Sequence, residues 1–277
     1  SGKSTSLFSI LSLLNNPTVN ISTIEDPVEY KIPGTNQTQV NVQAGMTFVN
    51  GLRALLRQDP NIIMVGEIRD SETAGLAVQA ALTGHLVFAT LHTNNAATCL
   101  PRLLDMGIEP FLIASTVRAV VGQRLVRRLC QHCKQSFKPD DKMIKTIAQS
   151  FGIKDTSVMQ YIYDLESQAI AGGIGVNQEA SSKTSSSSAK GITRLWKANL
   201  EGCDECGHVG FKGRLGIYEA LGNSTELQKL IISNATSGVI NDQAIKEGMV
   251  EMLIDGFVKA LRGETTIEEI LRVTAEA

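Results

Sequence analysis

The first five residues, Ser1-Gly2-Lys3-Ser4-Thr5, match the second half of the phosphate-binding motif G-x-x-x-x-G-K-[ST]. In the complete motif, backbone N–H groups surround the phosphates, the lysine reaches the β- and γ-phosphates, and the following hydroxyl binds Mg²⁺. The match therefore predicts part of a site for a nucleoside triphosphate with Mg²⁺. The first glycine of the motif is expected upstream of residue 1. We therefore expect the sequence to be a piece of a longer chain, with negligible activity alone.

Three apolar runs in the first half of the sequence each stop at a polar residue. The runs are rich in β-branched residues, are separated by helix-like segments, and span 19–24, 61–65 and 86–91. This alternation predicts an α/β domain with a parallel sheet. Ligands of open parallel sheets bind at the carboxyl ends of the strands. Glu25, Glu67 and His92 are therefore expected at the sheet edge where the phosphate loop also lies.

These residue types suit phosphoryl transfer, which depends on positioning and on neutralising charge. Glu67 follows its strand in the pattern of a Walker B acid, which holds Mg²⁺ directly or through water. Glu25 is then a candidate for orienting or deprotonating the attacking water, and His92 for hydrogen bonding to the γ-phosphate. Each has a structural alternative: a turn at Glu25, an exposed loop acid at Glu67, and a histidine that merely ends a strand at His92.

Composition excludes several classes of protein. No stretch approaches 18 uninterrupted apolar residues, so the sequence predicts no membrane-spanning helix. The formal net charge of −2 argues against a protein that binds nucleic acid through its overall charge. Five cysteines in 277 residues do not make a disulfide scaffold, which favours a reducing compartment.

Four of the cysteines form two C-x-x-C pairs, Cys130 with Cys133 and Cys203 with Cys206. Tetrahedral Zn²⁺ needs four ligands, and a set of four thiolates leaves no open position, so we predict a structural zinc site. The alternatives are a redox dithiol or incidental thiols, and neither explains two pairs at once. Cys99 stands among apolar residues and is expected to be an ordinary buried thiol.

Helices are expected at 5–11, after the phosphate loop, and at 143–149. Near the end of the chain, an apolar stripe at helical spacing comprises Val250, Leu253, Ile254, Phe257, Val258 and Leu261. Gly263 is expected to end that helix, and Thr266 to begin the next in a capping box with Glu269. Gly/Ser-rich tracts at 171–175 and 181–188 predict a flexible excursion between the cysteine pairs.

Three segments resemble the Asp box, Walker B motif and His box of the GspE/PilB family, the ATPases of type II secretion and type IV pilus assembly. They are TIEDPVEY (23–30), LRALLRQDPNIIMVGEIRD (52–70) and ALTGHLVFATLHTN (81–94). The resemblance continues through 102–130, 210–219 and 248–274, and covers nearly the whole chain apart from about 140–192.

The resemblance implies roles at the positions that match the family's motifs. They are the Walker A lysine and hydroxyl at Lys3 and Ser4, the Asp-box acid at Glu25 beside Asp26 and Glu29, the Walker B acid at Glu67, and the His box at His85 and His92. We count Gly2, Thr5, Asp26 and His85 among the candidate cofactor-binding residues, although a histidine that precedes its strand, as His85 does, is more often structural.

Three arginines near these motifs are further candidates. Arg53 and Arg57 are expected i, i+4 on one helix face, and Arg69 follows the Walker B acid. Stabilisation of phosphate charge or contact between subunits is one interpretation. Exposed or ion-paired arginines with no such role are the alternative.

Together these observations predict a RecA-like P-loop NTPase core at 1–125, with its N-terminal part missing, a zinc-binding subdomain at 126–213 and a helical C-terminal subdomain at 214–277. The family likeness implies Mg²⁺-dependent ATP hydrolysis that drives assembly of type IV pili or secretion pseudopili. It also implies a homo-oligomer, with the hexamer as the family's form, at the cytoplasmic face of an inner membrane, with a platform protein as partner.

Two alternatives remain at this stage. One is a motor of the same superfamily that serves pilus retraction or DNA uptake; retraction motors generally lack the two cysteine pairs. The other is a nucleic-acid translocase, which would need a basic channel and stacking aromatics. Aromatic residues make up only 5% of this sequence, so we expect no direct contact with nucleic acid.

Overall fold

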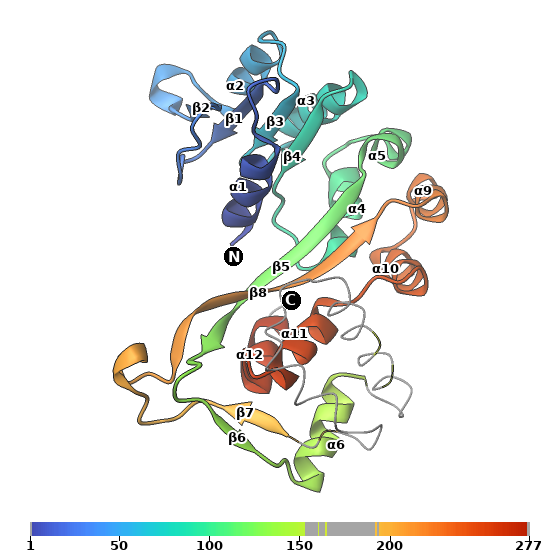
Figure 1. Ribbon diagram of the computed structural model, residues 1–277. Helices are drawn as coiled ribbons and strands as arrows, with labels where there is room; N and C mark the ends of the chain where they lie inside the picture. Colours follow the sequence, from blue (N-terminus) through green and yellow to red (C-terminus); the bar gives the residue numbers. More distant parts are fainter. Residues whose placement is uncertain (1, 153–159, 161–163, 165–191, 193, 276–277) are drawn as a thin grey trace. The chain divides into compact units, whose positions relative to one another are not determined.

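The computed structural model describes residues 2–152, 160, 164, 192 and 194–275 (Figure 1). The Gly/Ser-rich tracts predicted at 171–175 and 181–188 lie outside the described residues. The contacts divide the chain into two compact units. Unit 1 comprises Ser1–Gly122 and Ala220–Met249, and unit 2 comprises Gln123–Glu219 and Val250–Ala277. The three-part division predicted from the sequence follows motifs rather than contacts, and it stays a prediction.

A four-stranded sheet forms the centre of unit 1. Its strands stand in the order β2-β1-β3-β4, and each neighbouring pair is parallel. The bounds are β1 Ile21–Glu25, β2 Asn36–Gln39, β3 Ile62–Val65 and β4 Leu86–Ala89. The α/β class and the parallel sheet predicted from the sequence are confirmed, and three of the strands correspond to the three apolar runs.

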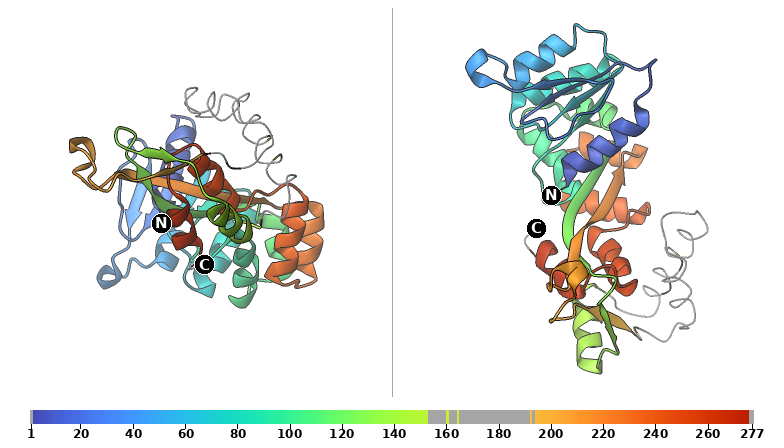
Figure 2. Two further views of the ribbon diagram at one scale, coloured as in Figure 1. Left: turned by 90° about the horizontal axis from the view of Figure 1, so that it is seen from below. Right: turned by 60° about the vertical axis from the view of Figure 1, so that its left-hand side comes forward.

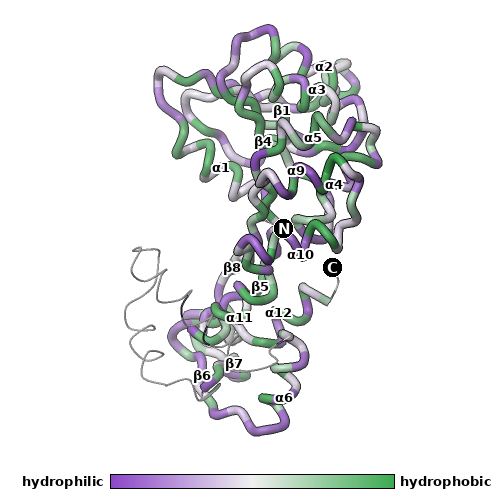
Figure 3. Tube along the Cα trace, turned by 90° about the vertical axis from the view of Figure 1, so that its right-hand side faces the viewer, coloured by the Kyte–Doolittle hydropathy of each residue, from purple (hydrophilic) through white to green (hydrophobic). Residues whose placement is uncertain are grey.

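Helices cover both faces of this sheet (Figure 2). Helix α1 (Lys3–Leu14) packs through Leu11 on one face, against Ile21 and Met64. Helices α2 (Phe48–Leu55) and α3 (Ser71–Leu82) share a second cluster with side chains of the opposite face, including Ile24. Figure 3 shows hydrophobic stretches, in green, in the strands of the sheet and in the helices around it.

Four further helices of unit 1 extend the same apolar cluster, namely α4 (Ala96–Asp105), α5 (Pro110–Thr116), α9 (Thr225–Ile232) and α10 (Ser237–Lys246). The short 3₁₀ helix η1 (Val42–Ala44) has no buried residue. Helices α9 and α10 lie side by side, and α9 also packs against α5. Residues from the last third of the chain therefore complete the core of a unit that begins at the phosphate loop.

Two details of unit 1 differ from the sequence-based expectations. Strand β2 was missed because its sequence, Asn-Gln-Thr-Gln, is polar and stands at the edge of the sheet. The placement of Arg57 on a helix with Arg53 is wrong, because α2 ends at Leu55. The chain leaves the helix towards Pro60, and the preceding Asp59 has φ 47°, a geometry that does not continue an α-helix.

Unit 2 is built on strand segments and on two helices at the end of the chain. Strands β5 (Ala119–Leu129) and β8 (Phe211–Gly222) pair, and each passes from one unit into the other along the chain. The antiparallel strands β6 (Gln135–Phe137) and β7 (Leu195–Lys197), the helices α6 (Asp141–Ser150), α11 (Met252–Leu261) and α12 (Ile267–Thr274), and the 3₁₀ helix η2 (Asp204–Cys206) complete the described elements.

The predicted apolar stripe near the end of the chain forms the core of unit 2. Phe257 of α11 is fully buried and packs on Phe151, with ring centroids 4.8 Å apart. The helix predicted at 143–149 is confirmed as α6. Thr266 caps α12 by accepting a hydrogen bond from the N–H of Glu269. The reciprocal half of the predicted capping box is not made, because the Glu269 carboxylate binds Arg127 instead.

None of the helices in the described ranges combines the length and the apolar character that a membrane-spanning helix needs.

Candidate active site and metal site

A cavity of about 170 Å³ lies at the carboxyl ends of β1, β3 and β4, beside the first turn of α1. Its lining comprises Lys3, Ser4, Leu7, Glu25, Asp26, Pro27, Glu29, Met64, Gly66, Glu67, Thr90 and His92. Six of the predicted site residues thus converge on one cavity: Lys3, Ser4, Glu25, Asp26, Glu67 and His92. Whole-ligand cavities usually measure about 300–1,000 Å³, so this space suits the phosphate end of a nucleotide.

The start of α1 supplies the positive side of the cavity. Gly2 has φ 77°, a left-handed conformation that glycine adopts without strain, and its carbonyl accepts the first helical hydrogen bond from Ser6. The N–H groups of a first helical turn point towards a bound anion. The ammonium of Lys3 donates a hydrogen bond to the carbonyl of Leu91, next to His92. Thr5 lies in the same turn and does not line the cavity.

Glu67 stands in the middle of a charged network. Its carboxylate binds Arg69 through one oxygen and lies 3.1 Å from Nε2 of His92 through the other. Burial alone would raise the pKa of Glu67, but the hydrogen bonds with Arg69 and His92 outweigh it and lower the pKa. The carboxylate is thereby kept negative, which is the state that binds a divalent cation.

Glu25 is only 5% exposed and lies at the last position of β1. Its Oε1 accepts hydrogen bonds from Thr23 at 2.6 Å and from Gln37 at 3.1 Å. Gly66 allows β3 to pass close to this point, since a Cβ there would lie 3.2 Å from the Cα of Glu25. Glu25 at the end of β1 and Glu67 after β3 therefore approach the cavity from adjacent strands.

The structure does not bring His85 to this cavity. It precedes β4, at the end of the sheet opposite the cavity, and its Nδ1 lies 2.9 Å from the carbonyl of Ala80. The sequence resemblance placed both histidines in one motif, but the length of β4 separates them. We therefore leave His85 out of the proposed nucleotide site.

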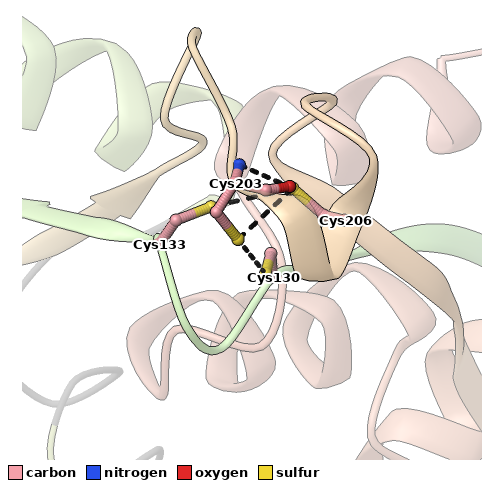
Figure 4. Close-up of side chains that lie close together, drawn as sticks. All are labelled: Cys130, Cys133, Cys203 and Cys206. Atoms are coloured by element: carbon pink, nitrogen blue, oxygen red, sulfur yellow. Dashed lines mark hydrogen bonds between the residues drawn. The ribbon is translucent and has the colours of Figure 1, made fainter.

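The four paired cysteines converge in unit 2, each with a sulfur within 4.8 Å of the other three (Figure 4). The Sγ atoms of Cys130 and Cys203 lie 3.7 Å apart, and those of Cys133 and Cys206 lie 3.8 Å apart. A tetrahedral zinc ion with Zn–S bonds of about 2.3 Å places its sulfurs about 3.8 Å from one another. The spacing matches a four-thiolate metal site, and it is too long for disulfides.

Strand pairing explains why cysteines so far apart in the sequence meet. Cys130 directly follows β5, and the second pair lies shortly before β8. Because β5 and β8 are neighbours, the two loops come together, and the N–H of Cys130 donates to the carbonyl of Gly210 at 3.0 Å.

The surroundings of the four thiols also favour binding of a cation. Burial would raise the pKa of Cys206, but N–H donors of Cys203, Gly210 and Val209 lower it to about 6. Burial and the neighbouring thiols raise the pKa of Cys133 to about 12. Four thiolates at this spacing repel one another, and a divalent cation removes the conflict. Cys99 is buried elsewhere, in α4, and takes no part.

Sequence reasoning did not identify Thr23 and Gln37 as the hydrogen-bond donors to Glu25. The signal for Thr23 was available, since residues i and i+2 of a strand face the same side. Gln37 gave none, because its strand has no apolar pattern.

The family model described as "Type II/IV secretion system protein" matches residues 1–272. The chain belongs to this family. Its relatives include the type IV pilus assembly ATPase PilB of Thermus thermophilus, 46% identical over 276 residues, which covers 100% of this chain and 27% of that protein. The type II secretion system protein E of Pseudomonas aeruginosa is 43% identical over 276 residues, covering 100% of this chain and 47% of the relative. The chain thus spans less than half the length of these two curated relatives.

Two solved structures, one of a pilus retraction motor and one of an ATPase, have the same fold as this chain. The pilus retraction motor PilT with bound ADP superposes with a TM-score of 0.60 at 24% identity, covering 99% of this chain and 58% of that one. The ATPase DotB of Legionella pneumophila gives 0.60 at 20% identity, covering 100% and 57%. These likenesses confirm the RecA-like fold class.

Proposed function

We propose that the full-length protein is a Mg²⁺-dependent ATPase that powers assembly of type IV pili or type II secretion pseudopili. The observation that carries the proposal is the convergence of Lys3, Glu25 and Glu67 on one cavity, at the sheet edge beside α1. Family membership supports it, since the relatives are named as pilus assembly ATPases and type II secretion proteins.

Six residues of the cavity have roles that their positions allow. Lys3 neutralises charge on the β- and γ-phosphates, with N–H groups of the first turn of α1 around them. The hydroxyl of Ser4 and the carboxylate of Glu67 would hold Mg²⁺, which would lower the charge of the reacting phosphate when bound. Glu25 orients or deprotonates the water that attacks, and His92 hydrogen-bonds to the γ-phosphate. Asp26 lines the same cavity and would add negative charge beside the metal.

We assign the four-cysteine cluster one structural Zn²⁺, held by Cys130, Cys133, Cys203 and Cys206. The sulfur spacing and the N–H donors to Cys206 support this assignment. A closed set of four thiolates offers no position for a substrate. The ion therefore stabilises the fold of unit 2 and takes no part in hydrolysis.

Family membership also supports a proposal for the partners. We propose a homo-oligomer, with the hexamer as the family's form, that acts at the cytoplasmic face of the inner membrane on a platform protein of the pilus or secretion machine. A retraction motor is the second candidate, since PilT shares the fold. The cysteine cluster favours assembly, because retraction motors generally lack both pairs.

Phosphate release by the full-length protein tests this function. We expect hydrolysis with Mg²⁺ and ATP, its loss on chelation of Mg²⁺, and a fall of at least about 100-fold in Lys3→Ala, which removes the main positive charge. Lys246→Ala, at an exposed position in α10, is the matched control and should keep wild-type turnover. Full activity in Lys3→Ala, or no hydrolysis by the wild type, would overturn the proposal.

A further inference from the structure

The two oxygens of the Glu25 carboxylate have different surroundings. Oε1 accepts two hydrogen bonds, one from the hydroxyl of Thr23 and one from the side-chain amide of Gln37. Among the described residues, no hydrogen bond reaches Oε2, and Glu25 lines the cavity. We propose that Thr23 and Gln37 are positioning residues that hold Oε1 and turn Oε2 towards the attacking water. This inference rests on the proposed ATPase function.

The sheet places these three side chains on one face. Thr23 and Glu25 are two positions apart in β1, so both side chains point to the same side. Gln37 is the register partner of Thr23 on the neighbouring strand β2. Ile21 and Met64 on this face pack against α1, the helix that begins at the phosphate loop. Thr23 and Gln37 therefore lie on the face of the sheet that α1 covers.

Gln37 is itself held in one orientation. Its Oε1 accepts a hydrogen bond from the N–H of Ile32 at 2.8 Å, and an N–H group cannot bond to the amide nitrogen in that way. The Nε2 group must then face the carbonyl of Tyr30, at 2.9 Å, and the carboxylate of Glu25. The loop after β1 thus fixes the amide, and the amide fixes the carboxylate.

Neither donor touches the cavity. Thr23 is fully buried, and neither Thr23 nor Gln37 is part of the lining. Any effect of either residue on hydrolysis must therefore pass through Glu25, and not through contact with nucleotide. This predicts a loss in kcat, with nucleotide affinity and KM little changed.

Thr23→Val in the full-length protein is the principal test, since valine keeps the shape of threonine and removes the hydroxyl. We expect kcat to fall by about 10- to 100-fold, the usual range for a buried hydrogen bond to a charged group. Affinity for ADP and the KM for ATP should stay within about threefold of the wild type, as expected when ground-state binding is unchanged. Thr23→Ser, which restores the hydroxyl, should recover most of the turnover.

Ser22→Ala is the matched control, because Ser22 is equally buried in β1 and its hydroxyl donates to Asn20 instead. Gln37→Glu is a second variant at the sheet edge. The new carboxylate still offers an oxygen to the N–H of Ile32, but it replaces the N–H donor to Glu25 with an oxygen that repels the Glu25 carboxylate. The kcat of this variant should therefore fall as well. This test does not depend on whether Thr23→Val folds.

The outcomes separate this inference from the function on which it rests. If the wild type does not hydrolyse ATP, the proposed function fails. If the wild type hydrolyses ATP and Glu25→Gln does not, while Thr23→Val or Gln37→Glu turns over normally, only the positioning role is overturned. A loss confined to KM in either variant would also contradict it.

Discussion

Oε2 of Glu67 lies 3.1 Å from Nε2 of His92, although the two residues are 25 positions apart and follow different strands. Adjacent parallel strands β3 and β4 bring them to the same edge of the sheet. The contact helps to lower the pKa of Glu67, together with the hydrogen bond from Arg69. The acid is therefore a carboxylate whose neighbours are the guanidinium of Arg69 and the imidazole of His92.

Glu67→Gln should lower the turnover of the full-length protein by about 10²- to 10³-fold, because an amide cannot supply the negative charge that holds Mg²⁺. Phosphate release at saturating ATP measures the effect. Glu72→Gln is the control, since Glu72 forms an exposed ion pair with Arg53 in the same unit. Turnover near the wild-type value in Glu67→Gln would show that Glu67 does not hold Mg²⁺.

Much of this site was predictable because the apolar runs mark the strands and parallel strands end at one edge. In this way the sequence predicted that Glu25, Glu67 and His92 lie at one edge of the sheet. His85 was included by resemblance, and it lies at the other end of β4. The contact of Gln37 with Glu25 was not predicted, because the polar edge strand β2 has no periodic pattern of apolar residues. The role of Glu269 escaped because its spacing from Thr266 fits a capping box, and only tertiary contacts show the carboxylate turning to Arg127.

Cys203→Ser should lower bound zinc from one ion per chain to well below one, since only three thiolates remain. The loss should also lower the melting temperature of unit 2, because binding of a structural metal is coupled to folding. Metal analysis and thermal unfolding of purified protein measure both effects. Cys99→Ser is the control for zinc content, because Cys99 lies outside the cluster. Substoichiometric zinc in the wild type, with two disulfides, would defeat the assignment.

The low pKa of Glu269 leads us to expect that the folded protein loses stability in acid. Burial would raise its pKa, but hydrogen bonds from Arg127 and Arg272 lower it from 4.5 to about 2. Its contribution is therefore fully present above about pH 4.5 and is lost as the pH falls towards 2. That lowering of the pKa is worth on the order of 3 kcal/mol of unfolding free energy.

Chemical denaturation at pH 6 and pH 3 tests this contribution. Glu269→Gln should be less stable than the wild type at pH 6. The difference should shrink at pH 3, because the Glu269 carboxyl of the unfolded wild-type chain is protonated there while that of the folded protein is still largely ionised. Glu268→Gln, at the exposed neighbouring position, should follow the wild type at both pH values. A constant difference between Glu269→Gln and the wild type would show that the ionised form contributes nothing.

Gly263→Ala should destabilise unit 2 by about 1–3 kcal/mol, the usual cost of forcing a group into a packed site. Gly263 has φ 71°, and a Cβ there would lie 2.8 Å from the Trp196 ring. Its carbonyl also accepts a hydrogen bond from Lys134, next to Cys133. Gly238→Ala in α10 has open space and should be neutral or slightly stabilising. Equal stability of the two variants would contradict this packing.

Hydrolysis and nucleotide binding by Glu25→Gln in the full-length protein test the central claim most directly. Glu25 acts on the water in this account, so the variant should bind ATP with Mg²⁺ nearly as the wild type does. It should release no phosphate in a single turnover, because the glutamine cannot accept the proton. Wild-type phosphate release by Glu25→Gln would contradict the account and leave the residue as a structural end of β1.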